Sequence, residues 1–394
     1  MHLDDAMTLD QSRRWQSSIF IAAIAALIFT PLFLTEVYAG TNATSDFPTH
    51  AQWALDIKNG NPVPPYVMAH SAWQFLLLAF NIFLGFSIQH AELISILLCV
   101  AFAAGILGWW FWPAFSKANI SLWQAVGIVL GISIAAPVSL LWFKDHAFYL
   151  GYVGIVSYHN PTIILLRPLA LLQFIYALRG FTLPPPSKAE IFVAILLSLL
   201  STFAKPNFAI CLLPAIALIA LFKIFRKETA HLTFLIFGFI APTAMVLAWQ
   251  FLMTYRGGDS SHVIFSAFGV MSTYSGYLLP KFLLSILFPL AVAILYWKQA
   301  SHNLQLILAW LVFAFGSFFT YFLAESGPRF KDGNFTWSGE IALFVLFAVS
   351  TIFFLDIQKP SRICRLTAEA LWFLQVAAGV IYYIFFTLHL LYIV

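Results

Sequence analysis

Charged residues are scarce in this chain of 394 residues: Asp, Glu, Lys and Arg make up 9% of it, whereas hydrophobic residues make up 61%. A compact soluble core cannot bury so large an apolar share, so a soluble globular protein is excluded. The apolar residues come in long runs and do not alternate with polar ones, which favours helices over a β-barrel. We therefore expect an all-α, polytopic transmembrane helical bundle that forms a single domain over residues 1–394.

Cysteine is scarce as well. Cys99, Cys211 and Cys364 are the three cysteines, and their spacing fits neither a disulfide framework nor a metal site. We interpret them as packing residues of apolar spans. The net charge of +4 comes mostly from loops and indicates membrane orientation, so we expect membrane lipids and no nucleic acid as partners.

The apolar runs predict about thirteen spans, because a crossing needs about 17 to 25 residues. Residues 148–157 are apolar but short; if they cross, most of the 20 Lys and Arg residues, including Arg13 and Arg14, share one side. This favours a cytoplasmic N-terminus and an outer C-terminus. His90 and Glu92 then fall at an inner turn, as capping groups. The other predicted spans are residues 19–34, 73–88, 93–111, 122–142, 162–178, 191–204, 208–225, 232–253, 277–297, 304–323, 341–354 and 366–393.

The longest polar stretch is the predicted first outer loop, residues 36–72. Within it, residues 49–58 have the spacing of a short helix lying in the membrane interface. Asp46 precedes this helix and is either its N-cap or a general base that takes a proton from a hydroxyl. His50, one turn further on, either orients Asp46 and binds the acceptor or is structural. Glu36 is a second acid that could assist.

His159 and Asn160 precede the next outward helix start. Asn followed by Pro satisfies the first free amides of a helix, and the remaining amides favour an anion. Arg167 lies roughly 10 Å deeper in the same helix, at 1.5 Å per residue. Such a depth is costly for arginine unless it meets a carboxylate or a phosphate. Arg167 therefore pairs with Glu36 or Asp46, or binds substrate phosphate.

Lys205 stands at another outward helix start, because Pro206 ends one helix and the next begins there. Its charge adds to the free amides, and phosphate is the ligand that uses both. The alternative is a lysine that extends to the interface. Arg256 lies in a loop with two glycines, which either closes over a ligand or, as we prefer, is a solvated loop.

The late outer loop, residues 325–338, combines charged and aromatic residues. Arg329 is a candidate to grip a phosphate, Glu325 to bind a sugar hydroxyl, and Trp337 to stack on a sugar ring. The alternative is an aromatic belt at the membrane interface with balancing charges.

Taken together, Asp46, His50 and the stretches 158–162, 204–207 and 325–337 give a chain that resembles the GT-C superfamily of polytopic glycosyltransferases. It looks most like bacterial members with an Asp-x-x-x-His first outer loop. The architecture of most of the chain fits, while the specific likeness is confined to these stretches. The sequence departs from the commoner paired acids, since no acid adjoins Asp46.

The resemblance implies a bacterial inner-membrane enzyme whose active face is outward and which inverts the transferred sugar. The donor would be a polyprenyl-phosphate sugar and the acceptor a glycan, a lipid or a protein. Asp46 would be the catalytic base, and the other residues named above would bind substrate. No cofactor is required, although a divalent metal is compatible with this chemistry.

Two other functions share the same residues. A transporter or flippase of a lipid-linked sugar would bind phosphate through the same cations without a reaction. Internal repeats and charges deep in several spans would favour transport, and the sequence shows neither. A polysaccharide ligase or polymerase would use a longer late outer loop.

Overall fold

The structure is a computed structural model that describes residues 3–38, 45–255, 261–358 and 361–389. Almost every element in these ranges is a helix, and the two short strands pair with each other. Eight of the described helices are long and apolar enough to cross a membrane, or nine if one bent pair counts as a span. The expected all-helical, membrane-type bundle is therefore confirmed in class, whereas the count of about thirteen spans is not confirmed.

The first part of the chain contains only helices and connecting segments. Its elements are α1 (Leu3–Tyr38), α2 (Phe47–Asn59), α3 (Pro65–Ala69), α4 (Ala72–Leu84), α5 (Ile88–Lys117), α6 (Leu122–Ile134), α7 (Trp142–Asp145), α8 (Pro161–Arg179) and α9 (Lys188–Ala204).

The second part adds a two-stranded sheet and two irregular helices. Its elements are α10 (Asn207–Phe225), α11 (Leu232–Leu235), the π-helix η1 (Ile236–Ile240), α12 (Ala241–Tyr255), β1 (Val263–Phe265), α13 (Gly269–Ser272), α14 (Leu278–Ser285), α15 (Leu287–Leu295), α16 (Trp297–Ala300), α17 (Leu304–Phe322), β2 (Leu323–Glu325), the 3-10 helix η2 (Gly327–Asp332), α18 (Thr336–Asp356) and α19 (Arg362–Thr387).

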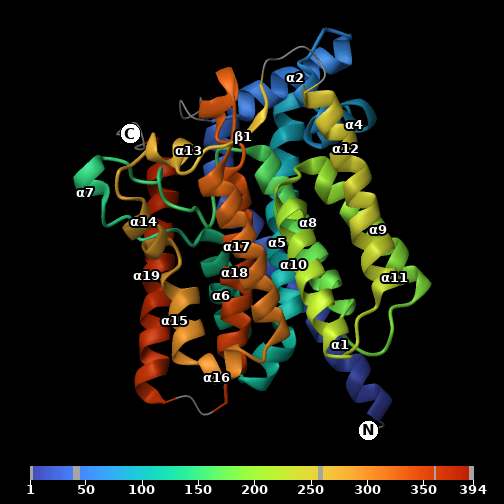
Figure 1. Ribbon diagram of the computed structural model, residues 1–394, viewed down its shortest axis with the longest axis vertical. Helices are drawn as coiled ribbons and strands as arrows, with labels where there is room; N and C mark the ends of the chain where they lie inside the picture. The colour runs from blue at the N-terminus through green and yellow to red at the C-terminus, as the bar shows by residue number, and fades with distance from the viewer. Residues whose placement is uncertain (1–2, 39–44, 256–260, 359–360, 390–394) are drawn as a thin grey trace.

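The long helices run roughly side by side, with α18 at the centre (Figure 1). In the candidate span that contains α18, 89% of the most apolar window is buried, whereas α19 on the outside has 22%. Helix α1 packs along α5, and α17 packs along α18. This burial contrast fits a bundle whose outer helices face lipid and whose central helix faces only protein.

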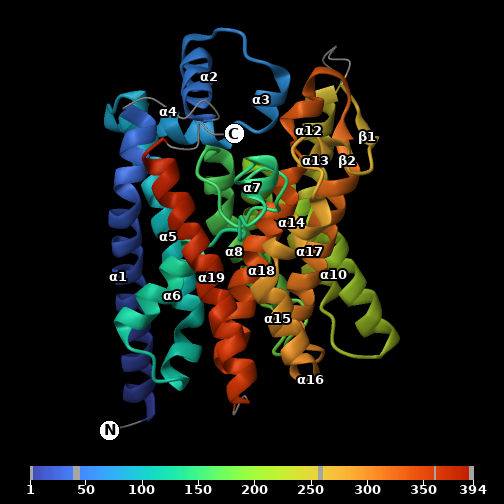
Figure 2. The same ribbon diagram turned by 90° about the vertical axis from the view of Figure 1, so that its left-hand side faces the viewer.

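Several short elements gather at one end of the bundle, which we call the α2 end. It contains α2, α3, α4, the paired strands β1 and β2, and η2 (Figures 1 and 2). Helix α1 begins at the opposite end, and α19 finishes near the α2 end. The predicted helix after Asp46 is thus confirmed as α2.

The predicted span over residues 73–88 is wrong. Helix α4 has 13 residues and so spans about 20 Å, less than the roughly 30 Å of a hydrocarbon core. Both views place it at the α2 end, together with the start of α5. His90 and Glu92 therefore lie at the α2 end and not at an inner turn, although Ser87 does cap α5 through the backbone amide of His90.

The predicted crossing at residues 148–157 is also wrong, because this segment contains no helix. It enters the bundle as an irregular chain whose Tyr152, Val153, Ile155 and Val156 are buried. The two wrong crossings, residues 73–88 and 148–157, both precede α8. Removing two crossings leaves the chain on the same side of the membrane at the start of α8. Helix α8 therefore still starts from the side we expected.

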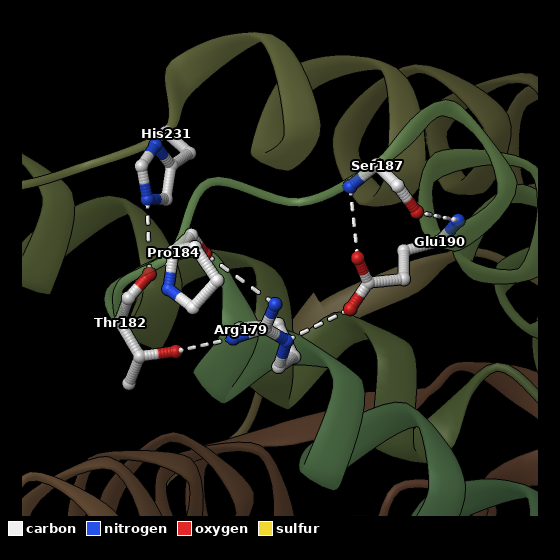
Figure 3. A network of polar contacts seen from close by, with 6 residues as sticks. All are labelled: Arg179, Thr182, Pro184, Ser187, Glu190 and His231. Atoms are coloured by element: carbon white, nitrogen blue, oxygen red, sulfur yellow. Dashed lines mark hydrogen bonds and ion pairs between the residues drawn. The ribbon is translucent and has the colours of Figure 1, made fainter.

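The opposite end holds short basic connections. Arg179 ends α8 and forms an ion pair with Glu190, whose backbone amide is capped by Ser187 (Figure 3). The Glu190 carboxylate in turn accepts a hydrogen bond from the backbone amide of Ser187, and the two bonds form a capping box at the start of α9. These contacts fix the turn between α8 and α9.

Candidate functional site

A cavity of about 800 Å³ opens at the α2 end. It lies among α2, α3, α12, η2 and the starts of α8, α10 and α18. Its lining includes these residues predicted from sequence: Asp46, His50, Asn160, Lys205, Glu325, Arg329 and Trp337. The structure thus brings together two acids, two cations and an aromatic ring from segments far apart in the chain.

Asp46 precedes α2 but makes no side-chain capping bond to it. Its Oδ2 instead accepts a hydrogen bond from Nδ2 of Asn160 at 2.6 Å. Its backbone amide donates to the carbonyl of His159 at 2.9 Å. The interpretation of Asp46 as a helix cap is therefore wrong, and its carboxylate is held against the start of α8.

Asn160 connects Asp46 to Lys205. Its Oδ1 caps α8 by accepting from the backbone amide of Ile163 at 3.0 Å. The same oxygen accepts from the hydroxyl of Thr162 at 2.6 Å, and Nζ of Lys205 donates to that hydroxyl at 2.9 Å. Two side chains thus link the acid to the lysine through continuous hydrogen bonds, an arrangement that fixes both groups.

Lys205 does not extend to the interface. It lies in extended conformation between α9 and α10, with Nζ 4.9 Å from the ring centroid of Trp337. Burial lowers the pKa of Lys205 to about 8, although the nearby charges of Asp46 and Glu340 favour its protonated form. A lysine at this position carries a positive charge at neutral pH and loses it only slightly above.

Arg329 is the second cation of the cavity. Its guanidinium lies 3.0 Å from Oε1 of Glu325 and 4.5 Å from the ring centroid of Tyr66. Glu325 also accepts from the Tyr255 hydroxyl at 2.7 Å and from the Asn334 amide. Three protein donors thus occupy the Glu325 carboxylate, which fixes Arg329 in the wall of the cavity.

Arg167 does not line this cavity. It lies buried in α8 and meets Oε1 of Glu340 at 3.7 Å, so the predicted pairing with Glu36 or Asp46 is wrong. Glu340 also accepts from the hydroxyls of Ser157 at 2.6 Å and Tyr149 at 2.7 Å. Sequence alone gave no register between α8 and α18, so it could not identify this partner.

The remaining predicted residues lie elsewhere. Glu36 and Glu92 line a second cavity of about 540 Å³ near the end of α1. The His159 ring lies 5.2 Å from the ring of Trp337, so His159 packs behind the cavity wall. Burial lowers the pKa of His159. Arg256 lies outside the described residues.

Sequence reasoning missed several polar side chains of the cavity, among them His70, Gln74, Gln250 and Tyr66. Gln74 and Gln250 stand inside otherwise apolar helices, where an amide is costly without a partner. That isolation was the signal that could have found them. Among the described residues, no group of three or more His, Cys, Asp or Glu could hold a metal ion.

The fold and the cavity define a class: a polytopic helical membrane protein with a cavity at one end of its bundle that is lined by charged, polar and aromatic side chains. Comparison with known protein families, with curated proteins and with solved structures found no match for this chain. The cavity chemistry therefore carries the functional argument.

Proposed function

We propose that the protein is an integral-membrane glycosyltransferase of the GT-C type. It would move a sugar from a polyprenyl-phosphate donor to a glycan, lipid or protein acceptor. The observation that carries this proposal is the placement of Asp46 and Lys205 in one cavity, joined through Asn160 and Thr162. A base and a phosphate-binding cation are the two groups that such a transfer needs.

In the reaction, the carboxylate of Asp46 takes the proton of the acceptor hydroxyl. The acceptor oxygen forms a bond to the anomeric carbon, and the bond from that carbon to the phosphate oxygen breaks. Attack from the face opposite the phosphate inverts the anomeric centre. Polyprenyl phosphate leaves with the electron pair, and Lys205 and Arg329 stabilise its growing negative charge.

The distribution of basic residues supports an outward-facing cavity in the bacterial inner membrane. Cytoplasmic loops carry more Lys and Arg than outer loops. The ends of helices away from the α2 end carry Arg14, Arg179, Lys188, Lys223, Arg226, Lys298, Arg362 and Arg365. The N-terminus would then be cytoplasmic.

The proposal is tested by Asp46→Asn in protein reconstituted with a polyprenyl-phosphate sugar and an acceptor. Loss of the base should lower the transfer rate about 10²- to 10⁴-fold while donor binding is retained. Asp356→Asn is the matched control, because Asp356 is half-exposed at the far end of α18, where it pairs with Lys117. Unchanged turnover in Asp46→Asn would remove Asp46 as the base, and donor movement across the bilayer without product would favour the flippase.

A further inference from the structure

Two histidine–glutamine pairs in the cavity have no role in the steps above. Nδ1 of His50 lies 2.8 Å from Nε2 of Gln74, and Nδ1 of His70 lies 3.0 Å from Nε2 of Gln250. All four residues line the cavity. Gln74 is 1% exposed and Gln250 is 4% exposed, so both amides are built into the protein.

The contact with Gln74 assigns the protonated nitrogen of the His50 ring. An amide nitrogen only donates, so Nδ1 of His50 accepts from Nε2 of Gln74, and the hydrogen of that neutral ring is on Nε2. Nε2 of Gln250 has two hydrogens and three acceptors within reach, because the carbonyls of Ala69 at 3.0 Å and Thr202 at 2.8 Å face it together with Nδ1 of His70. In the described part of the chain, Nε2 of His50 and of His70 makes no hydrogen bond.

Both rings are neutral at physiological pH. Burial first, and then the charge of Lys205, lower the pKa of His50 to about 3. Burial also lowers the pKa of His70 to about 3, with further contributions from Lys205 and Arg329. Each ring therefore offers an uncharged nitrogen for hydrogen bonding.

The glutamines hold the two rings in place. Oε1 of Gln74 and Oε1 of Gln250 have no hydrogen-bond partner among the described residues, and both oxygens are shielded from solvent. The groups that face a ligand are therefore the Nε2 atoms of the two neutral rings. A neutral imidazole nitrogen pairs well with a hydroxyl group, which both donates and accepts.

This group of side chains adjoins the proposed phosphate site. The charges of Lys205 and Arg329 both act on His70, so His70 lies within electrostatic reach of the two cations. The ring of Trp53 lies 5.0 Å from the ring of His50 and 6.2 Å from that of Tyr66. These aromatic rings supply an apolar surface on which a sugar ring can pack.

We propose that the His50–Gln74 and His70–Gln250 pairs form a subsite that hydrogen-bonds the hydroxyl groups of an uncharged sugar on the donor lipid. This inference rests on the proposed function and names the sugar class that the same cavity accepts. The donor phosphate occupies Lys205 and Arg329, so a uronate would face the uncharged imidazoles and an amino sugar would add a second positive charge beside the two cations; both are costly in a desolvated site.

The test uses the full chain in lipid nanodiscs and four probes: polyprenyl phosphate alone, and polyprenyl phosphate carrying an uncharged hexose, the matching uronate or the matching amino-hexose. We expect the uncharged hexose form to bind about tenfold more tightly than either ionised form. His70→Phe, which removes the N–H but keeps a ring, should weaken hexose-form binding about tenfold. Binding of polyprenyl phosphate alone should not change.

His50→Phe is the second variant, with the same expected result, and thermal unfolding shows which variants fold. His90→Phe is the control, because His90 is exposed at the α2 end and outside the cavity. Equal binding of charged and uncharged forms would overturn the inference alone, as would equal weakening of bare polyprenyl phosphate in both variants. Failure of wild-type protein to bind bare polyprenyl phosphate would overturn the proposed function as well.

Discussion

The two ends of the bundle use similar polar residues in opposite ways. At the far end, Arg179 donates to Glu190 at 2.9 Å, to the Thr182 hydroxyl at 3.1 Å and to the Pro184 carbonyl at 3.4 Å (Figure 3). His231 contacts the Thr182 carbonyl at 3.0 Å and completes the network. The partners of Arg179 lie within 11 positions of it, and His231 joins from 49 positions beyond Thr182, so the network holds two loops together.

At the α2 end, the partners come from distant segments and the pairing is incomplete. Asp46 and Asn160 are 114 positions apart, and the Gln74 and Gln250 oxygens have no partner among the described residues. Burial lowers the pKa of Lys205 there, whereas the Arg179 hydrogen bond lowers the pKa of Glu190 to about 2 at the other end. At the far end, the Arg179 network pairs its polar groups with one another. At the α2 end, the cavity has polar groups available for a ligand.

The largest effect on donor binding is expected at Lys205. Lys205→Ala should weaken donor binding about tenfold to a hundredfold, because it removes a charged donor to the phosphate. Acceptor binding should change much less. Isothermal titration with polyprenyl phosphate and, separately, with acceptor measures both, and equal losses for the two ligands would reject the phosphate role.

Lys205→Arg is the matched variant, and it adds a pH test. The folded-state pKa of Lys205 is lowered to about 8, so the wild-type lysine is charged below that pH and neutral above it. Donor binding should therefore fall as pH rises through about 8 in the wild type. Arginine stays protonated, so Lys205→Arg should bind independently of pH up to about 10.

A smaller effect is expected at Asn160, which orients Asp46 through a hydrogen bond. Asn160→Ala removes the bond to Oδ2 of Asp46 and the cap of α8, so turnover should fall about tenfold and stability by about 1 kcal/mol. Asn160→Ser keeps a capping oxygen but is too short to reach Asp46. It should lose turnover while keeping most of the stability, and equal stability losses in both variants would show a purely structural role.

These residues also show what could be predicted from the sequence. Composition and apolar runs predicted the helical membrane class, because lipid leaves few solutions for the backbone. Polar residues at outward helix starts predicted Asn160 and Lys205, since free amides and proline mark such positions locally. Both residues line the cavity, together with five residues predicted from the polar loops.

The predictions that failed concerned which helices face each other and how deeply a segment lies in the membrane. Arg167 lies where the sequence indicated, yet its partner Glu340 is 173 positions away in α18, and no local pattern connects the two. Residues 73–88 are as apolar as a span, but α4 ends at Gly85, which adopts a left-handed conformation with φ of 69°. Hydropathy records the apolar content of that segment but not the turn that keeps it at one end.

The smallest effect is expected at the far end, where Glu190→Gln should lower stability by less than about 1 kcal/mol, as for exposed ion pairs, and leave turnover unchanged. The folded-state pKa of Glu190 lies at about 2, below its ordinary 4.5, so its contribution is present above pH 4.5. That contribution is lost as pH falls through the interval down to about 2. Thermal unfolding in nanodiscs at pH 7 and pH 3 measures it: the wild type should lose its small advantage over Glu190→Gln at the lower pH. A lower transfer rate in Glu190→Gln would contradict the purely structural role of the far end, because it would show that this end affects the reaction in the cavity.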